Sequence, residues 1–208
     1  MMTFPHDVTA MRRDLHSFPE TAFLEYRTAS LVAQRLTELG YSVRVGPEIM
    51  SMNDVRGLPT EEGIQAAQKD ALANGADPFW LTRMPGGQTA VCGEIQRGEG
   101  PVVALRFDMD ALPVHESSSE HHSPALGNFR SRHEGRMHAC GHDGHTAIGL
   151  AVAEKLSRPE AEWKGTLRFI FQPAEEGGRG AQPIVSSGLL DDVDRFLATH
   201  LGCQLPSG

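Results

Sequence analysis

The stretch that decides the fold class is HTAIGLAVAEKLSRPEAEWKGTLRFIFQPAEE, residues 145–176. Its first part, 145–156, has the pattern of an apolar helix, and the apolar run at 165–171 has the length of a buried strand. A second run of this kind, PVVALRF at 101–107, precedes it. Strands that alternate with helices in this way predict an α/β sheet that is largely parallel in this half of the chain.

Helix and strand patterns also fill the N-terminal half. Apolar residues recur at helical spacing over 7–18 and 25–39, which predicts two helices. Residues 46–88 have the character of an insertion, whose helix TEEGIQAAQKDALANG begins at a capping threonine. This insertion either covers one side of the core or forms a wall of a substrate pocket. The other predicted elements are strands at 41–45, 89–95 and 195–200 and a short helix that ends at Ser187.

Composition limits the classes of partner. Lys plus Arg number 19 and Asp plus Glu number 27, so the formal charge is −8, and the chain has no basic tract suited to a nucleic acid. No apolar run is long enough for a membrane span and the N-terminus lacks the apolar core of a signal peptide, so a soluble, cytoplasmic protein is expected. The three cysteines, Cys92, Cys140 and Cys203, form neither a disulfide framework nor a CxxC motif.

Polar residues follow the predicted strands at the point where each strand ends. They are Asp108 and Asp110, Glu175 and Glu176, and His200. Functional groups in open α/β sheets gather beyond the carboxyl ends of the strands, so these side chains are expected at one edge. The motif HACGHDGH adds Cys140 and His142, which in an extended chain would project to the same side.

This combination of side chains predicts a metal site. Thiolate, imidazole and carboxylate are ligands for a transition metal, so Cys140 is predicted to bind one. Each group alone has an ordinary explanation, as a core cysteine, a surface histidine or a turn-forming aspartate. A metal-free α/β domain with Cys140 as a redox-sensitive thiol would require their convergence to be coincidental.

The adjacent pair Glu175 and Glu176 suggests a division of labour, because neighbouring side chains cannot face one metal with the same geometry. One carboxylate would bind metal. The other would take a proton from metal-bound water as the hydroxide attacks a carbonyl carbon, and would then deliver it to the leaving amine. This chemistry is the hydrolysis of an amide.

A family resemblance rests on five segments: LHSFPETAFLEYRTASLVAQRLTELGY, LRFDMDALPVHE, GRMHACGHDGHTAIGL, GTLRFIFQPAEEGGRGA and ATHLG. In order and spacing, the chain resembles the amidohydrolase branch of the aminoacylase and carboxypeptidase metallopeptidase family. The resemblance implies an α/β fold, namely a three-layer metallopeptidase-type catalytic domain with a mostly parallel sheet flanked by helices. In this chain the domain would be incomplete at its C-terminus.

The same resemblance implies roles for individual residues. Two divalent transition metal ions, zinc or manganese, would be held by Cys140, His142, Glu176 and His200. Glu175 would be the general base, and Asp110 would orient a metal ligand from behind it. Packing and orienting roles are expected for His138 and His145. Exposure to solvent is expected for His115, His121, His122 and His133.

Within this branch, the segment after 41–45 resembles p-aminobenzoyl-glutamate hydrolase. This implies an N-acyl or N-aroyl amino acid substrate, specifically p-aminobenzoyl-glutamate cleaved to p-aminobenzoate and glutamate, and a homodimer or a heteromer with a related subunit. The family continues past Gly208 through a lid and dimerisation domain to a further histidine ligand, so residues 1–208 are expected to be the N-terminal portion of the catalytic domain. The alternative is a noncatalytic metal-binding fragment or a degenerate relative.

Overall fold

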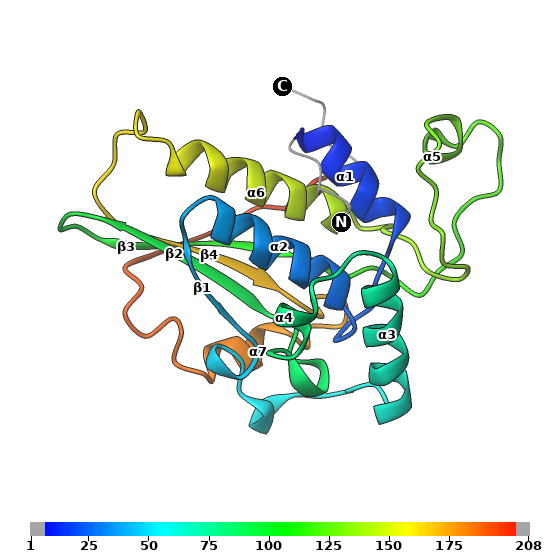
Figure 1. Cartoon of the computed structure of the whole chain (residues 1–208), viewed down its shortest axis with the longest axis horizontal. Helices are drawn as coiled ribbons and strands as arrows, with labels where there is room; N and C mark the ends of the chain where they lie inside the picture. The colour runs from blue at the N-terminus through cyan, green and yellow to red at the C-terminus, as the bar shows by residue number, and fades with distance from the viewer. Residues whose placement is uncertain (1–6, 203–208) are drawn as a thin grey trace.

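The computed structural model describes residues 7–202, which form a five-stranded mixed sheet covered by helices (Figure 1). The strands are β1 Ser42–Val45, β2 Val91–Arg97, β3 Val102–Asp108, β4 Gly165–Gln172 and β5 Arg195–Ala198. Strand β2 pairs antiparallel with β1 and β4, whereas β3 pairs parallel with β4 and β5. The α/β class is confirmed, and the parallel pairing lies in the half of the chain for which the sequence predicts it. Cys203 lies outside the described residues.

The order of the strands in the sheet, β1-β2-β4-β3-β5, departs from their order in the chain. Only residues 98–101 separate β2 from β3, but β4 lies between the two strands. Strand β2 therefore runs opposite to β4, while β3 runs alongside β4 in the same direction. This arrangement brings the carboxyl ends of β3, β4 and β5 to one edge.

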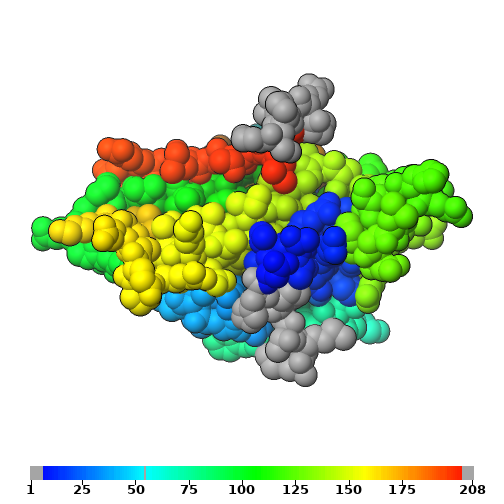
Figure 2. Space-filling view, turned by 90° about the horizontal axis from the view of Figure 1, so that it is seen from above, coloured from blue at the N-terminus to red at the C-terminus, as the bar shows by residue number. Residues whose placement is uncertain are grey.

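Helices α1 Val8–Ser17, α2 Tyr26–Glu38 and α6 His142–Ser157 lie over one face of the sheet (Figure 1). Figure 2 shows α1 and α6 side by side in the view from above, with the segment of β5 along one edge. Leu150 of α6 and Phe169 of β4 belong to the buried apolar cluster between these helices and the sheet. Burial of such side chains stabilises the layer by about 1.5 to 3 kcal/mol each.

The opposite face is covered by α7 Ala181–Val185 and by the segment that follows β1. Ile184 of α7 and Ile49 are buried in a second apolar cluster, which also contains Ile170 of β4. Layers on both faces of the sheet make a three-layer arrangement. No helix within residues 7–202 combines the length and the apolar character needed to cross a membrane.

The segment 46–88 contributes to both faces. It holds the short helices η1 Gly46–Glu48, η2 Met52–Asp54 and η3 Pro85–Gly87 and the helices α3 Glu61–Ala73 and α4 Pro78–Leu81. Helices α3 and α4 pack beside α2, and Thr60 Oγ1 accepts a hydrogen bond from Gly63 N, as expected of a capping threonine. The segment therefore covers the core. One further helical turn, α5 Ser123–Leu126, lies in the loop after β3.

Helix α6 begins at His142, three residues before its predicted start. Gly141 precedes it with φ +87°, a left-handed conformation that glycine adopts without steric cost. Cys140 and His142 are therefore separated by a turn. The expectation that they share one side of an extended chain is wrong, although the turn still brings both side chains to the same site.

Two helical glycines are expected to respond in opposite ways to alanine. A Cβ atom on Gly149 of α6 would lie 2.8 Å from ring atoms of Phe107 and 2.9 Å from Phe171, so Gly149→Ala should lower the free energy of unfolding by about 1 to 3 kcal/mol through overpacking. A Cβ atom on Gly63 of α3 would lie 3.4 Å from Thr60 Oγ1 and 3.7 Å from Pro59 Cβ, which is ordinary van der Waals contact. Gly63→Ala should therefore raise the free energy of unfolding by about 0.5 to 1 kcal/mol. Urea unfolding of both variants checks this. Equal effects would contradict the close approach of α6 to the sheet.

Candidate metal centre

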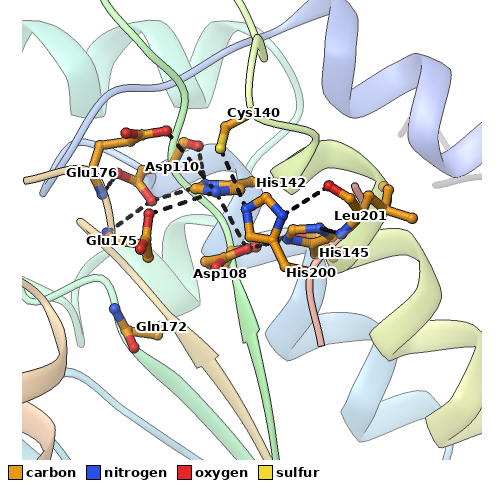
Figure 3. Close-up of polar contacts among 12 residues, drawn as sticks. Asp108, Asp110, Cys140, His142, His145, Gln172, Glu175, Glu176, His200 and Leu201 are labelled. Atoms are coloured by element: carbon orange, nitrogen blue, oxygen red, sulfur yellow. Dashed lines mark hydrogen bonds and ion pairs between the residues drawn. The ribbon is translucent and has the colours of Figure 1, made fainter. Parts of the chain in front are cut away.

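The candidate site lies where β3, β4 and β5 end and α6 begins (Figure 3). Asp108 is the last residue of β3, and His142 is the first residue of α6. Glu175 and Glu176 follow β4, and His200 follows β5 by two residues. The topology thus delivers side chains from four separate segments to one place, as the sequence predicts for this edge.

The ligand atoms of these side chains lie close together. Those of Cys140, His142 and His200 are within 4.8 Å of one another, and so are those of His142, Glu175 and Glu176. Cys140 Sγ lies 3.4 Å from His200 Nε2. His142 Nε2 lies 3.7 Å from Glu175 Oε2 and 4.0 Å from Glu176 Oε1. His142 is common to both groups, so the two groups form one continuous cluster.

Two buried atoms in this cluster fit a metal ion. Within the described part of the chain, neither His142 Nε2 nor Glu176 Oε1 has a hydrogen-bond partner. A buried polar atom left without a partner is destabilising, and such atoms are rare in proteins. Both atoms face the same space as a thiol and a second imidazole, so a divalent transition metal would satisfy them and would match their chemistry.

The electrostatics of the cluster also favour a cation. Burial and the neighbouring Glu176 carboxylate raise the pKa of the Cys140 thiol to about 11. Burial lowers the pKa of His142, but its hydrogen bond to Asp110 and the charges of Asp108 and Asp110 outweigh burial, so the net direction is upward. Both shifts report a strongly negative environment. A bound cation would lower the pKa of the Cys140 thiol instead, because coordination removes the thiol proton.

Asp110 contacts both parts of the cluster. Its main-chain oxygen accepts a hydrogen bond from His142 Nδ1 at 2.8 Å, which leaves Nε2 free to act as a ligand. Its carboxylate accepts from the backbone N–H groups of Glu175 at 2.9 Å and Glu176 at 3.0 Å. Asp110 therefore fixes the imidazole and the glutamate turn at the same time.

His145 holds the segment that carries His200. Its Nδ1 lies 2.5 Å from Asp108 Oδ1, and its Nε2 accepts a hydrogen bond from Leu201 N at 2.9 Å. The His145 and His200 rings are 4.6 Å apart between centroids. This is an orienting contact of the kind expected for His145. Asp108, which has no assigned role at the level of sequence, anchors it and is itself bound by Arg106 at 2.6 Å.

Sequence reasoning missed a second buried polar network. His16 contacts Asp143 at 2.8 Å through Nδ1 and Glu116 at 3.2 Å through Nε2, and Arg12 binds the same Asp143 oxygen at 2.8 Å. His138 is buried beside His16, and burial lowers its pKa to about 4. The partners of His16 lie 100 and 127 residues away along the chain, so no local pattern could reveal them.

The histidines of the loop after β3 differ from the expectation of full exposure. His115 and His121 are exposed. His122 is half-buried and lies 2.9 Å from Glu116, and His133 is half-buried and lies 3.4 Å from Asp70. The expectation is wrong for these two because a carboxylate contacts each ring: Glu116 of the same loop contacts His122, and Asp70 of α3 contacts His133.

The insertion also lines a hollow on the surface. This hollow, of about 600 Å³, lies against the turn that follows the two glutamates; its lining residues are Asn53, Val55, Arg56, Gly178, Arg179 and Gln182. Arg179 donates hydrogen bonds to the main-chain oxygens of Glu176 at 3.2 Å and Gly57 at 3.1 Å. The 46–88 segment is thereby tied to the turn that carries Glu176.

Two curated proteins match almost the whole chain. Indole-3-acetyl-aspartic acid hydrolase of Enterobacter agglomerans is 44% identical over 203 residues, which cover 97% of this chain and 47% of that protein. One subunit of the p-aminobenzoyl-glutamate hydrolase of Escherichia coli K12 is 45% identical over 198 residues, which cover 95% of this chain and 45% of that protein. The chain therefore spans about half the length of the curated relatives it matches.

Solved structures agree with the sequence matches. The aminobenzoyl-glutamate utilization protein of Klebsiella pneumoniae superposes with a TM-score of 0.80 at 38% identity, covering 97% of this chain and 44% of that one. A Bacillus subtilis protein described as a dinuclear metal binding peptidase from the M20 family gives 0.70 at 34% identity, covering 96% and 43%. The sequence profile of peptidase family M20/M25/M40 matches residues 104–208, which include every residue of the candidate site. The chain belongs to peptidase family M20/M25/M40.

Proposed function

We propose that this chain carries the metal site of an amide hydrolase that acts on N-acyl or N-aroyl amino acids. The observation that carries the proposal is the convergence of Cys140, His142 and His200 with Glu175 and Glu176 in one cluster, with two of its buried ligand atoms lacking a partner among the described residues. Family membership and the dinuclear metal binding described for the Bacillus subtilis relative support it.

Four side chains would hold two divalent transition metal ions: Cys140, His142, Glu176 and His200. Thiolate and imidazole favour zinc by their softness, and the carboxylate also accommodates manganese. Bound metal supplies polarisation of the substrate carbonyl and a lower pKa for water. The protein supplies the fixed orientation of the ligands, through Asp110 behind His142 and His145 beside His200.

Glu175 is assigned the proton transfers. Its side chain is 37% exposed, against 23% for Glu176, and Glu176 is the residue with a buried oxygen that lacks a partner among residues 7–202. The more open carboxylate can reach water and a substrate amide. Glu175 would accept the proton of the attacking water and deliver it to the leaving amine, while Asp110 holds the backbone of both glutamates.

The specific substrate proposed is p-aminobenzoyl-glutamate, cleaved to p-aminobenzoate and glutamate. Two relatives at 44% and 45% identity are named for hydrolysis of indole-3-acetyl-aspartate and p-aminobenzoyl-glutamate, which both join an aromatic acyl group to an acidic amino acid. The second of them is named as one subunit of its enzyme, so the working form proposed is a homodimer or a complex with a related subunit.

A substrate panel tests this function. Purified protein, expressed both as this chain and as any longer reading frame of its gene, is incubated with Zn²⁺ or Mn²⁺ and with p-aminobenzoyl-glutamate, indole-3-acetyl-aspartate or p-aminobenzoyl-lysine. Release of the aromatic acid is followed by chromatography. We expect the two acidic conjugates to be cleaved and the lysine conjugate to be cleaved far more slowly. Metal binding without cleavage of any of them would favour a noncatalytic relative.

A further inference from the structure

The turn that carries the two glutamates has an unusual backbone. Ala174 adopts φ +51°, a left-handed conformation that is sterically unfavourable for a residue with a side chain. Glu175 and Glu176 follow it directly, so the direction of both side chains depends on this residue. Something in the surrounding structure must stabilise the conformation.

Buried carboxyl groups hold three successive backbone N–H groups of this turn. Ala174 N donates to Glu25 Oε1 at 2.9 Å, and Glu175 N and Glu176 N donate to the two oxygens of Asp110. Glu25 is fully buried and lies 149 residues before Ala174 in the chain. The amide clamp, defined here as Glu25 and Asp110 with these three N–H groups, therefore fixes the turn at every residue from 174 to 176.

The second oxygen of Glu25 links the clamp to the rest of the fold. Oε2 lies 2.6 Å from Thr89 Oγ1, next to the start of β2, and Glu25 itself directly precedes α2. Burial and the nearby Asp110 charge raise the pKa of Glu25 to about 8, so near neutral pH it is mainly a neutral acid. The Glu25 carboxyl accepts from Ala174 N with Oε1 and from the Thr89 hydroxyl with Oε2. A glutamine amide can keep both contacts, because its oxygen can accept from Ala174 N and its NH2 group can donate to the Thr89 hydroxyl oxygen.

We propose that Glu25 is a positioning residue for Glu175 and Glu176, which acts by holding the left-handed Ala174 through its backbone N–H. The inference rests on the proposed function of the two glutamates. Among residues 7–202, no hydrogen bond or ion pair joins Glu25 to either of their side chains, so its effect on metal and substrate would be transmitted through the turn. No local motif links the two segments, because the contact joins the residue that precedes α2 to the end of β4.

The chain offers a matched control in Glu20. Glu20 is likewise buried, at 5% exposure, and its two oxygens accept from the backbone N–H groups of Arg27 and Thr28 at 2.8 Å each. These contacts lie in the first turn of α2 and do not include the glutamate turn. Loss of Glu20 thus removes a buried carboxyl group with two backbone contacts but leaves the amide clamp intact.

The test compares Glu25→Ala, Glu25→Gln and Glu20→Ala by three readouts: amide hydrogen exchange of a peptide covering 173–178, affinity for Zn²⁺, and kcat and KM for an N-aroyl amino acid. Glu25→Ala should speed exchange and lower Zn²⁺ affinity and kcat about 10- to 100-fold with little change in KM. Glu25→Gln should stay close to wild type in all three. Glu20→Ala should lower Tm without these changes. If Glu25→Ala does not fold, Glu25→Asp, too short to make both contacts, replaces it.

The proposal is overturned if exchange and Zn²⁺ affinity in Glu25→Ala match wild type, or if Glu20→Ala changes them equally. It is also overturned if Glu25→Gln behaves like Glu25→Ala. Because exchange and metal affinity require no substrate, they decide the role of Glu25 even if the wild-type protein hydrolyses no amide. In that case only the proposed function fails.

Discussion

Replacing Glu175 with glutamine is expected to lower kcat for amide hydrolysis about 100- to 10,000-fold, the range that a general acid–base residue contributes. Glutamine has the same shape, and its backbone N–H can still donate to Asp110. It cannot accept a proton from water or return one to the leaving amine. The turn and the metal ligands therefore stay in place while the proton transfer is lost. Kinetics on p-aminobenzoyl-glutamate, together with elemental analysis of the same preparation, measure both properties.

Two controls separate proton transfer from other effects of the substitution. Glu176→Gln should lower the metal content as well as kcat, because Glu176 is assigned as a ligand. Glu160→Gln, at an exposed residue beyond the end of α6, should change neither. Full activity of the Glu175→Gln protein would show that another group handles the proton, and a loss of metal equal to that of Glu176→Gln would make Glu175 a ligand.

Much of this site could be predicted, because the polar residues that form it directly follow the predicted strands in the sequence. Asp108, Glu175 and His200 each follow an apolar run, and parallel strands bring their carboxyl ends to one edge. The body of α6, predicted over 145–156, follows from apolar spacing alone. Composition and order along the chain thus predict the type of site, whereas the roles of single residues in it stay predictions that rest on the family resemblance.

Other features depend on contacts that no local pattern contains. The left-handed Gly141 shifts the start of α6, and β4 pairs with both β2 and β3 and so lies between two strands that are neighbours in the chain. Phe107 is 6% exposed and packs against Phe169 and Phe171 next to Gly149, which leaves room for the ring. Long-range contacts such as that of Glu25 with Ala174 form only when the whole fold is assembled.

Changing Cys140 and His142 together to alanine is expected to abolish transition-metal binding. His142 belongs to each group of ligand atoms in the site, and Cys140 supplies the thiol that lies 3.4 Å from His200. Without them, only Glu176 and His200 remain of the four assigned ligands. Wild-type chain loaded with Zn²⁺ and freed of excess should retain at least about one ion per chain by elemental analysis, and the double variant close to none. His142→Ala alone should lose more metal than Cys140→Ala alone.

Cys92→Ala is the matched control, because it removes a cysteine from a place that cannot reach the metal. Cys92 is fully buried in the second apolar cluster, where burial raises the pKa of its thiol to about 11. Its loss should lower the free energy of unfolding through the cavity that it leaves but should not change the metal content. If the double variant keeps its metal, the ion is bound elsewhere. If the folded wild-type chain binds no metal, the cluster of Cys140, His142, Glu176 and His200 is not a metal site in this chain.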